Sequence, residues 1–214
     1  MRLYYFTTQT FGIRALEDRR LKIARINELN DPFEFLSWNV QDASTRAKLR
    51  AWKSAQNDRL GIVCFSRNWS NPLLWSHYAE KHQGMALGFD VPEGDLYSPV
   101  KYQRRRLAFP CDRELDGDDV KDVLLTKFTA WRYESEYRCF CLLANSVRDG
   151  ELYFEPYSET LRLAQVIVGD LSKISRGELA DALGSQAAVV ETFKARPAFG
   201  SFKVVKNLNR GLWR

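Results

Sequence analysis

Two glutamates, Glu134 and Glu136, stand two residues apart in the segment KFTAWRYESEYR, which runs from Lys127 to Arg138. If the chain is extended from Arg132 to Arg138, both carboxylates point to one face, about 7 Å apart at roughly 3.3 Å rise per residue. One carboxylate can then stabilise a developing cation while the other positions or deprotonates a nucleophile. The two flanking arginines share that face and keep both acids ionised. This segment is our first candidate for a catalytic edge.

A purely structural explanation fits the same segment. On a strand edge, alternating arginines and glutamates form a ladder of salt bridges, and in a helix Glu134 and Arg138 form an ordinary surface pair four residues apart. The E-x-E spacing is common, so spacing alone favours this structural explanation. Other segments must decide between the two.

The two histidines of the chain, His77 and His82, lie in a second polar and aromatic segment, CFSRNWSNPLLWSHYAEKHQG. They are five residues apart, so one helix does not stack them as the i, i+4 metal pair of an HExxH motif. Trp75 and Tyr78 serve either as core aromatics or as a platform that stacks a flat ring. Ser66, at the end of an apolar strand, can donate a hydrogen bond to a ligand, although no GxSxG elbow marks a serine triad.

A third segment, INELNDPFEF, carries a turn. The side chains of Asn30 and Asp31 can bond the local backbone, and Pro32 fixes its own φ. The segment is either a rigid structural loop or a rigid loop that presents Asn30, Asp31 or Glu34 to a ligand.

The elements that must position these segments are many short strands and a few helices that do not alternate strictly with them. This order predicts a mixed α+β fold, with largely antiparallel sheets and flanking helices, rather than a doubly wound parallel sheet. We find no repeat or linker, so residues 1–214 form a single predicted domain. Strands are expected at residues 3–6, 21–26, 61–66, 85–91, 97–102, 136–144, 164–169, 187–193 and 199–205, and helices at 8–17, 43–56, 73–82, 118–128 and 176–183.

Composition and the start of the chain bear on location. Hydrophobic residues make up 45% and charged residues 28%, the balance of a soluble globular protein. No stretch approaches the roughly 18 apolar residues of a membrane span, and the first residues lack a signal core. We therefore expect a cytoplasmic protein without membrane partners. Of the four cysteines, three lie in apolar runs and are expected as buried free thiols in a reducing compartment rather than as metal ligands, namely Cys64, Cys139 and Cys141; the fourth is Cys111.

Positive charge gathers in two places, within a net charge of +5. One cluster comprises Lys101, Arg104, Arg105 and Arg106, and the other is the stretch 194–214, which has six basic residues and no acid. Such patches bind nucleic acid or another polyanion, or they are simply solvated. The acids between Asp112 and Asp122 are a further reason to expect the first cluster to be neutralised.

Taken in order, the three segments resemble a widespread bacterial family of domain-of-unknown-function proteins. Its pattern is an aromatic first strand, LNDPFE, then CFS with W-x-x-Y-A-x-x-H-x-G, then K-x-x-x-W-x-x-E-x-E-x-R. This chain has LNDPFE at residues 29–34, CFS at 64–66, WSHYAEKHQG at 75–84 and KFTAWRYESEYR at 127–138. The resemblance covers most of the chain.

The layout of that family is similar to the ADP-ribosyltransferase superfamily, whose members split NAD between nicotinamide and ribose. The resemblance implies that Glu136 is the catalytic glutamate and that Glu134 orients the acceptor. It implies NAD as substrate, a protein or nucleic-acid acceptor, and a role as a toxin or in defence against phage. By analogy with the superfamily, the residues that contact NAD are Tyr5 (or Tyr4) on the first strand, Asn30, Asp31, Ser66, His77, Tyr78 and Lys127, the last as a phosphate contact.

Two other function classes remain open at this point. The basic clusters fit a non-catalytic module that binds nucleic acid or a protein partner, with strong dependence on salt. A nuclease that holds magnesium through Asp31, Glu34, Glu134 and Glu136 is the third reading, since hard oxygen ligands suit that ion. Oligomeric state is left open.

Overall fold

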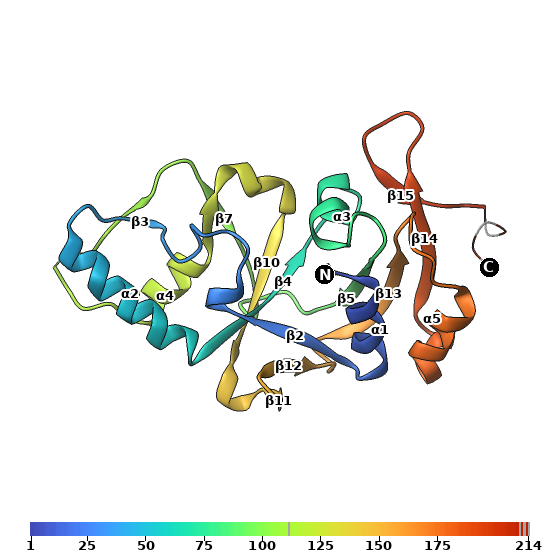
Figure 1. The fold of residues 1–214 in the computed structure, drawn as a ribbon, viewed down its shortest axis with the longest axis horizontal. Coiled ribbons are helices and arrows are strands. Elements are labelled where there is room, and N and C mark those ends of the chain that lie inside the picture. Colours follow the sequence, from blue (N-terminus) through green and yellow to red (C-terminus); the bar gives the residue numbers. More distant parts are fainter. Residues whose placement is uncertain (111, 210, 212, 214) are drawn as a thin grey trace.

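The computed structural model describes residues 1–110, 112–209, 211 and 213. Within these residues one mixed sheet of eleven strands runs through the molecule, with its strands antiparallel except for the β13–β14 pair (Figure 1). This confirms the predicted α+β class. The strands are β1 (Arg2–Thr7), β2 (Arg20–Arg25), β4 (Leu60–Ser66), β5 (Met85–Asp90), β6 (Tyr97–Pro99), β10 (Glu136–Leu142), β11 (Val147–Asp149), β12 (Leu152–Pro156), β13 (Arg162–Val168), β14 (Glu191–Pro197) and β15 (Val204–Lys206).

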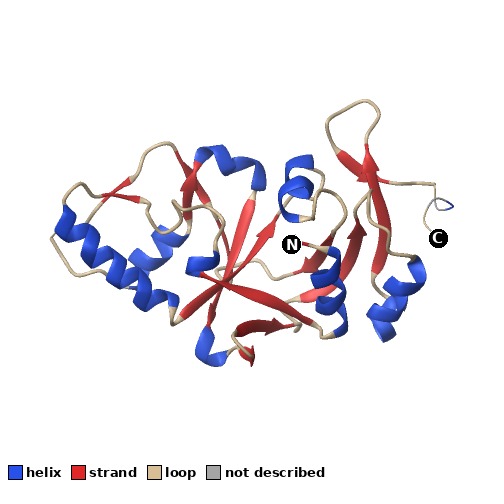
Figure 2. Ribbon diagram, viewed as in Figure 1, coloured by secondary structure: helices blue, strands red, loops and turns tan. Residues whose placement is uncertain are grey.

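Helices and two small parallel strand pairs flank the sheet (Figure 2). One end of the molecule carries α2 and α4, and the other carries α1 and α5. The helices are α1 (Gln9–Glu17), α2 (Ala43–Asn57), α3 (Pro72–Tyr78), α4 (Gly117–Leu124) and α5 (Arg176–Leu183), with 3-10 turns η1 (Ile26–Glu28), η2 (Thr129–Glu134), η3 (Leu143–Asn145) and η4 (Gly184–Ala188). The small pairs join β3 (Trp38–Asn39) to β8 (Leu107–Ala108) and β7 (Lys101–Gln103) to β9 (Thr126–Phe128).

Strand β4 is the element from which the site is built. Along one edge it pairs with β10 over its whole length. Along the other edge it pairs first with β2, where Ile62 faces Ala24, and at its end with β1, where Ser66 faces Tyr4. Between those contacts β1 and β2 diverge. We call this divergence the strand fork.

The two faces of the sheet at the fork differ in chemistry because side chains alternate along a strand. Val63 and Phe65 of β4 belong with Cys139 and Cys141 of β10 to the largest apolar core. On the opposite face, β4 and β10 instead carry Cys64, Ser66, Glu136 and Arg138, which face one another across the pair. Two further apolar clusters lie on this opposite face, one around Trp75 and one around Trp38, Ile62 and Val123.

Several predicted boundaries were wrong for local reasons. The predicted helix at 118–128 ends at Leu124, whose carbonyl accepts from the Arg138 guanidinium, and the chain then forms β9. The predicted helix at 73–82 ends at Tyr78, and the next turn is left-handed. That turn is held by Gly84, because a Cβ there would lie 2.2 Å from the carbonyl oxygen of Thr7. The predicted strand at 97–102 is two short strands, and those at 187–193 and 199–205 begin only at residues 191 and 204.

Other predicted elements were confirmed. Helix α1 begins after Thr8, whose side chain accepts from the Phe11 amide as an N-cap. Helix α5 spans residues 176–183 as predicted, and a capping box of Ser175 and Glu178 fixes its start. Among the described residues, no helix combines the length and apolar content needed to cross a membrane.

Candidate functional site

Five charged side chains meet on the polar face of the fork, and none is more than slightly exposed. We call them the charged cluster: Glu34, Lys127, Glu134, Glu136 and Arg138. They come from the LNDPFE loop, from β9, from η2 and from β10. Residues spread over a hundred positions of sequence therefore converge in one buried group.

The LNDPFE loop delivers Glu34 to the cluster. The Asp31 carboxylate accepts from the Phe33 amide at 2.9 Å, and the Asp31 carbonyl accepts from the Glu34 amide at 2.9 Å. Phe35 then takes a left-handed conformation with φ 63°. This tight turn points the Glu34 side chain inward, so Asp31 acts here as a structural residue of the loop.

Arg138 is the centre of the cluster and is fully buried. Its guanidinium donates two hydrogen bonds, of 2.7 and 3.0 Å, to the Glu34 carboxylate. It donates two further hydrogen bonds, of 2.7 and 3.1 Å, to the Glu136 carboxylate. Burial alone disfavours its charge, but the Glu136 and Glu34 carboxylates outweigh burial and raise its pKa well above the ordinary value. Such paired, two-bond contacts fix both carboxylates in place.

Lys127 joins the remaining carboxylate to this group. Its Nζ lies 2.7 Å from Glu134, 3.2 Å from Glu136 and 3.3 Å from Glu34. Burial opposes its charge, yet the three glutamates prevail and raise its pKa. Three carboxylates against two cations leave the cluster with a formal charge of −1. Lys127, which was expected to contact a phosphate of NAD, is thus held among carboxylates.

The backbone between Glu134 and Glu136 is not extended, so the predicted alternation of Arg132 to Arg138 on one face was wrong. Glu134 ends η2, and Ser135 takes a left-handed conformation with φ 46° before β10 begins. The Ser66 hydroxyl donates to the Glu134 carbonyl at 2.5 Å. The two carboxylates still meet, but through Lys127. A solvated salt-bridge ladder is likewise wrong, because Glu134, Glu136 and Arg138 are all buried.

The two glutamates differ in their affinity for protons. For Glu134, burial raises the pKa, and the charge on Glu136 adds to this against the opposing effect of Lys127. For Glu136, burial also opposes ionisation, but Arg138 and Lys127 outweigh it and lower the pKa to about 2. Both Glu136 oxygens contact cations, whereas one Glu134 oxygen contacts a neutral phenol. Carboxylates whose pKa values are pushed apart are suited to different roles.

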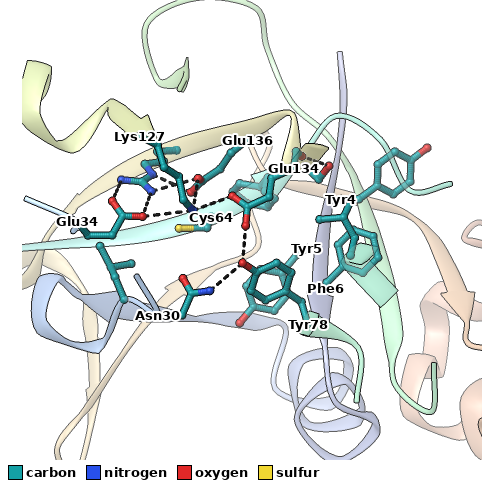
Figure 3. Close-up of a pocket in the computed structure, with 15 residues that line it drawn as sticks. Tyr4, Tyr5, Phe6, Asn30, Glu34, Cys64, Tyr78, Lys127, Glu134 and Glu136 are labelled. Atoms are coloured by element: carbon teal, nitrogen blue, oxygen red, sulfur yellow. Dashed lines mark hydrogen bonds and ion pairs between the residues drawn. The ribbon is translucent and has the colours of Figure 1, made fainter. Parts of the chain in front are cut away.

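A cavity of about 150 Å³ opens beside Glu134 at the strand fork (Figure 3). Tyr78 reaches into it from α3, donates a hydrogen bond to the Glu134 carboxylate and accepts one of 2.8 Å from the side-chain Nδ2 of Asn30. The phenol thereby links the LNDPFE loop, α3 and the charged cluster. We call this the fork cavity; it is lined by Tyr4, Tyr5, Phe6, Leu29, Asn30, Glu34, Cys64, Phe65, Ser66, Leu74, Tyr78, Lys127, Glu134, Glu136 and Arg138.

The structure brings most of the sequence-derived candidates to this cavity. Seven of them line it, and two do not. Asp31 is buried on the far side of the loop, and His77 is exposed, with its Nδ1 2.8 Å from the Tyr133 hydroxyl. Those that line the cavity are Tyr5, Asn30, Ser66, Tyr78, Lys127, Glu134 and Glu136.

Three residues of the second segment contribute to the packing and the hydrogen bonding of the fold, namely Trp75, His82 and Ser66. Trp75 is fully buried, donates to the Trp69 carbonyl at 2.6 Å and stacks on His82. Trp75 is therefore a core aromatic rather than a ring platform. The Ser66 hydroxyl donates to the Glu134 carbonyl and accepts from the Asn68 amide, which ties β4 to the turn that carries Glu134.

Two residues that contact the candidate site, Tyr102 and Cys64, were not identified from the sequence. The Tyr102 hydroxyl accepts from the Glu136 amide at 2.8 Å, and burial raises the pKa of that phenol to about 12. Cys64 lines the fork cavity, and burial, with Glu136 adding, raises the pKa of its thiol well above the ordinary value. The signal for Cys64 was its position two residues before Ser66, on the same strand face. No sequence signal identified Tyr102.

The structure bears differently on the two other functions considered from the sequence, a magnesium-dependent nuclease and a module that binds nucleic acid. Among the described residues no group of three His, Cys, Asp or Glu side chains could hold a metal ion, and the Lys127 ammonium lies among the three glutamates. Of the basic cluster, Lys101 pairs with Asp122, but Arg104, Arg105 and Arg106 have no ion pair with any described residue. Arg210, Arg214 and Cys111 lie outside the described residues.

In comparisons with known proteins, the chain matched no protein-family model, no curated protein and no solved structure.

Proposed function

We propose that this protein is an NAD-cleaving enzyme of the ADP-ribosyltransferase type, with the fork cavity as its active site. The observation that carries the proposal is the buried pair Glu134 and Glu136, held by Lys127 and Arg138 beside a cavity rimmed by tyrosines. The ordered motifs of the sequence, ending in E-x-E, support the same assignment. A cavity at the point where β1 and β2 diverge along β4 supports an ADP-ribosyltransferase-like arrangement.

The size of the fork cavity limits what it holds. Sites for whole drug-sized ligands occupy roughly 300–1,000 Å³, whereas the fork cavity has about 150 Å³. It therefore takes one ring of the dinucleotide, and we assign it to nicotinamide, with Tyr78 and Tyr5 at its walls. The rest of NAD extends out of the cavity over the protein surface.

The reaction breaks the bond between C1′ of the ribose and the pyridinium nitrogen. Its electron pair goes to nicotinamide, which leaves as a neutral ring, and C1′ becomes part of an oxocarbenium ion. An oxygen or nitrogen of the acceptor then forms the new bond to C1′ and loses its proton to a carboxylate. Fixed negative charge beside the developing cation lowers the barrier, and the charged cluster has a formal excess of one negative charge.

We assign the working carboxylate to Glu134, which reverses the order implied by the resemblance. Glu136 has both oxygens on cations and a pKa of about 2, so it is a poor proton acceptor. Glu134 has a raised pKa and one oxygen bonded only to the Tyr78 hydroxyl. When NAD moves Tyr78 aside, that oxygen faces the ribose and can take the acceptor's proton. Glu136 then positions Lys127 and Arg138.

Release of nicotinamide from labelled NAD tests the proposal, with protein and nucleic-acid acceptors added separately and NAD binding followed by calorimetry. Glu134→Gln should lower turnover by about 10²-fold or more, the usual effect of losing a general base, in protein whose fold is confirmed by circular dichroism. Glu159→Gln, which removes an exposed carboxylate elsewhere, is the matched control and should keep full activity. Absence of both nicotinamide release and NAD binding would refute the proposal.

A further inference from the structure

A second cavity, of about 500 Å³, adjoins the charged cluster on the side away from Tyr78. It shares Glu34 and Lys127 with the fork cavity, so these two side chains form the wall between them. We call it the arginine cavity. It is lined by Asp31, Pro32, Phe33, Glu34, Leu36, Ser37, Gln103, Arg104, Arg105, Arg106, Thr126, Lys127, Phe128 and Trp131.

The charge of the arginine cavity is positive and uncompensated. Arg104, Arg105 and Arg106 are exposed and make no ion pair with any residue in the described part of the chain. Its two carboxylates are occupied inside the protein, since Asp31 accepts from the Phe33 amide and Glu34 is gripped by Arg138. Three exposed cations around one concavity are therefore free to bind an anion.

Aromatic rings accompany these cations. Phe33 is 59% exposed and Phe128 54% exposed, and both line the same cavity, so their rings are accessible from outside. The Arg106 guanidinium lies 5.6 Å from the Phe33 ring centroid. The Trp131 ring contributes a third flat surface and is held by Lys127 at 4.8 Å. Rings interleaved with arginines are the combination that binds single-stranded nucleic acid, with bases on the rings and phosphates on the cations.

We propose that the arginine cavity binds a segment of single-stranded nucleic acid, with phosphates on Arg104, Arg105 and Arg106 and an unstacked base against Phe33, Phe128 or Trp131. A concave, largely apolar site admits a base that has left its stack, whereas a duplex keeps its bases inside. An acidic peptide would satisfy the arginines but would leave the three rings without flat partners. Resting on the function proposed above, this strand is the acceptor, since its cavity shares Glu34 and Lys127 with the fork cavity.

Direct binding tests this inference without NAD. Labelled DNA and RNA strands of about eight nucleotides, within the usual site size of such surfaces, are titrated by fluorescence anisotropy beside a duplex and a poly-glutamate peptide of similar length. The single strands should bind more tightly than the duplex and the peptide. If the protein contacts the 2′-hydroxyl, only the RNA strand should do so. With three phosphates neutralised, log K should fall with log salt at a slope of about −2.

Matched variants locate the site. Replacing Arg104, Arg105 and Arg106 together by Gln should weaken binding by at least about tenfold at low salt and flatten the salt slope. The control replaces three exposed lysines elsewhere by Gln, namely Lys48, Lys173 and Lys203. Phe128→Ser should weaken binding by about fivefold or more, from lost stacking, whereas Phe11→Ser on α1 should not. Circular dichroism confirms the fold of each variant.

The outcomes separate this inference from the proposed function. No binding of single strands, preference for the duplex or the peptide, or an arginine variant that binds as well as its lysine control overturns the nucleic-acid site. Nicotinamide release is measured separately with water as acceptor. If it persists while strand binding is absent, only the inference fails; if strands bind but NAD is neither bound nor cleaved, the proposed reaction fails and the site remains.

Discussion

The two faces of the β4–β10 pair are built from the same two strands and are opposite in chemistry. One face sets Val63 and Phe65 against Cys139 and Cys141 in the main core. The other sets Cys64 and Ser66 against Arg138 and Glu136, with Glu34, Lys127 and Glu134 packed on top. Both faces are buried, so the difference is not one of inside against outside.

The apolar face needs no further explanation, since burying such side chains stabilises the sheet. The charged face does, because each buried ion loses its hydration, and replacement of a buried ion-pair group by apolar residues is often neutral or stabilising. A buried group of five charges is therefore weak evidence for stability. We interpret it through the proposed function, in which its fixed charges act on a bound molecule. The predictions below test that difference.

The largest effect is expected from Arg138→Met. The variant leaves Glu34 and Glu136 buried without their shared guanidinium, which costs about 3–5 kcal/mol of unfolding free energy. Urea unfolding at neutral pH measures it. Arg132→Met is the control, because Arg132 is exposed in the same segment, and its cost should stay within about 0.5 kcal/mol. Equal, small costs for both variants would mean that the cluster is not held by Arg138.

The charged face should make stability depend on pH, and the apolar face should not. The folded-state pKa of Glu136 is about 2 against an ordinary value of 4.5. The unfolded chain thus binds more protons between these values, and the stabilisation, present above pH 4.5, is lost as pH falls toward 2. Its size is about 3 kcal/mol. The raised pKa of Glu134 acts in the opposite sense, so it cannot be the source of this loss.

Unfolding of Glu136→Gln at several pH values measures this contribution. Relative to the native protein, the variant should be destabilised near neutral pH, and the deficit should shrink toward zero as pH falls to about 2. Phe65→Leu on the apolar face should show a deficit that is the same at every pH. A constant deficit for Glu136→Gln would mean that the pKa of its carboxylate is the same in the folded and the unfolded protein.

Much of the fold could be predicted from the sequence, because alternation and capping are local signals. The strand at 61–66 and the helix at 176–183 follow from an apolar run and from a Ser175–Glu178 box. What failed was set by distant contacts. Nothing near residues 118–128 indicates that the Leu124 carbonyl accepts from Arg138, and nothing near His82 indicates that Gly84 lies against Thr7.

The residues of the candidate site could be found from the sequence, but the role of each residue could not. The motifs placed Asn30, Tyr78 and Glu134 among the candidates, and the structure brings their side chains into contact. The relative roles of Glu134 and Glu136 depend on which oxygen contacts Arg138, and that follows from the turn at Ser135. Local sequence does not determine such a contact.

A matched pair of cysteines compares the two faces directly. Cys139→Ser places a hydroxyl in the apolar core, where an unsatisfied polar group costs about 1–3 kcal/mol. Cys64→Ser places the same hydroxyl beside the Glu136 carboxylate, which can accept its hydrogen bond, so the cost should be under about 1 kcal/mol. Thermal or urea unfolding of the two variants gives the comparison. The reverse order of costs would contradict the assignment of Cys64 to the polar face.

A small stability effect is expected at the rim of the charged face, from Tyr78→Phe. The variant loses the bonds of the phenol to Glu134 and Asn30, at a cost of about 0.5–1.5 kcal/mol. Its informative effect is on titration, because the hydrogen bond from Tyr78 lowers the pKa of Glu134 and its loss should raise that pKa further. The acid limb of kcat/KM for nicotinamide release, which reports the free enzyme, should therefore move to higher pH. Tyr133→Phe, which loses a hydroxyl bonded to His77 outside the cavity, should leave that limb in place. If Tyr78→Phe lowers stability but leaves the limb unmoved, the phenol only holds the loop to α3, and Glu134 does not carry the titration that sets the rate.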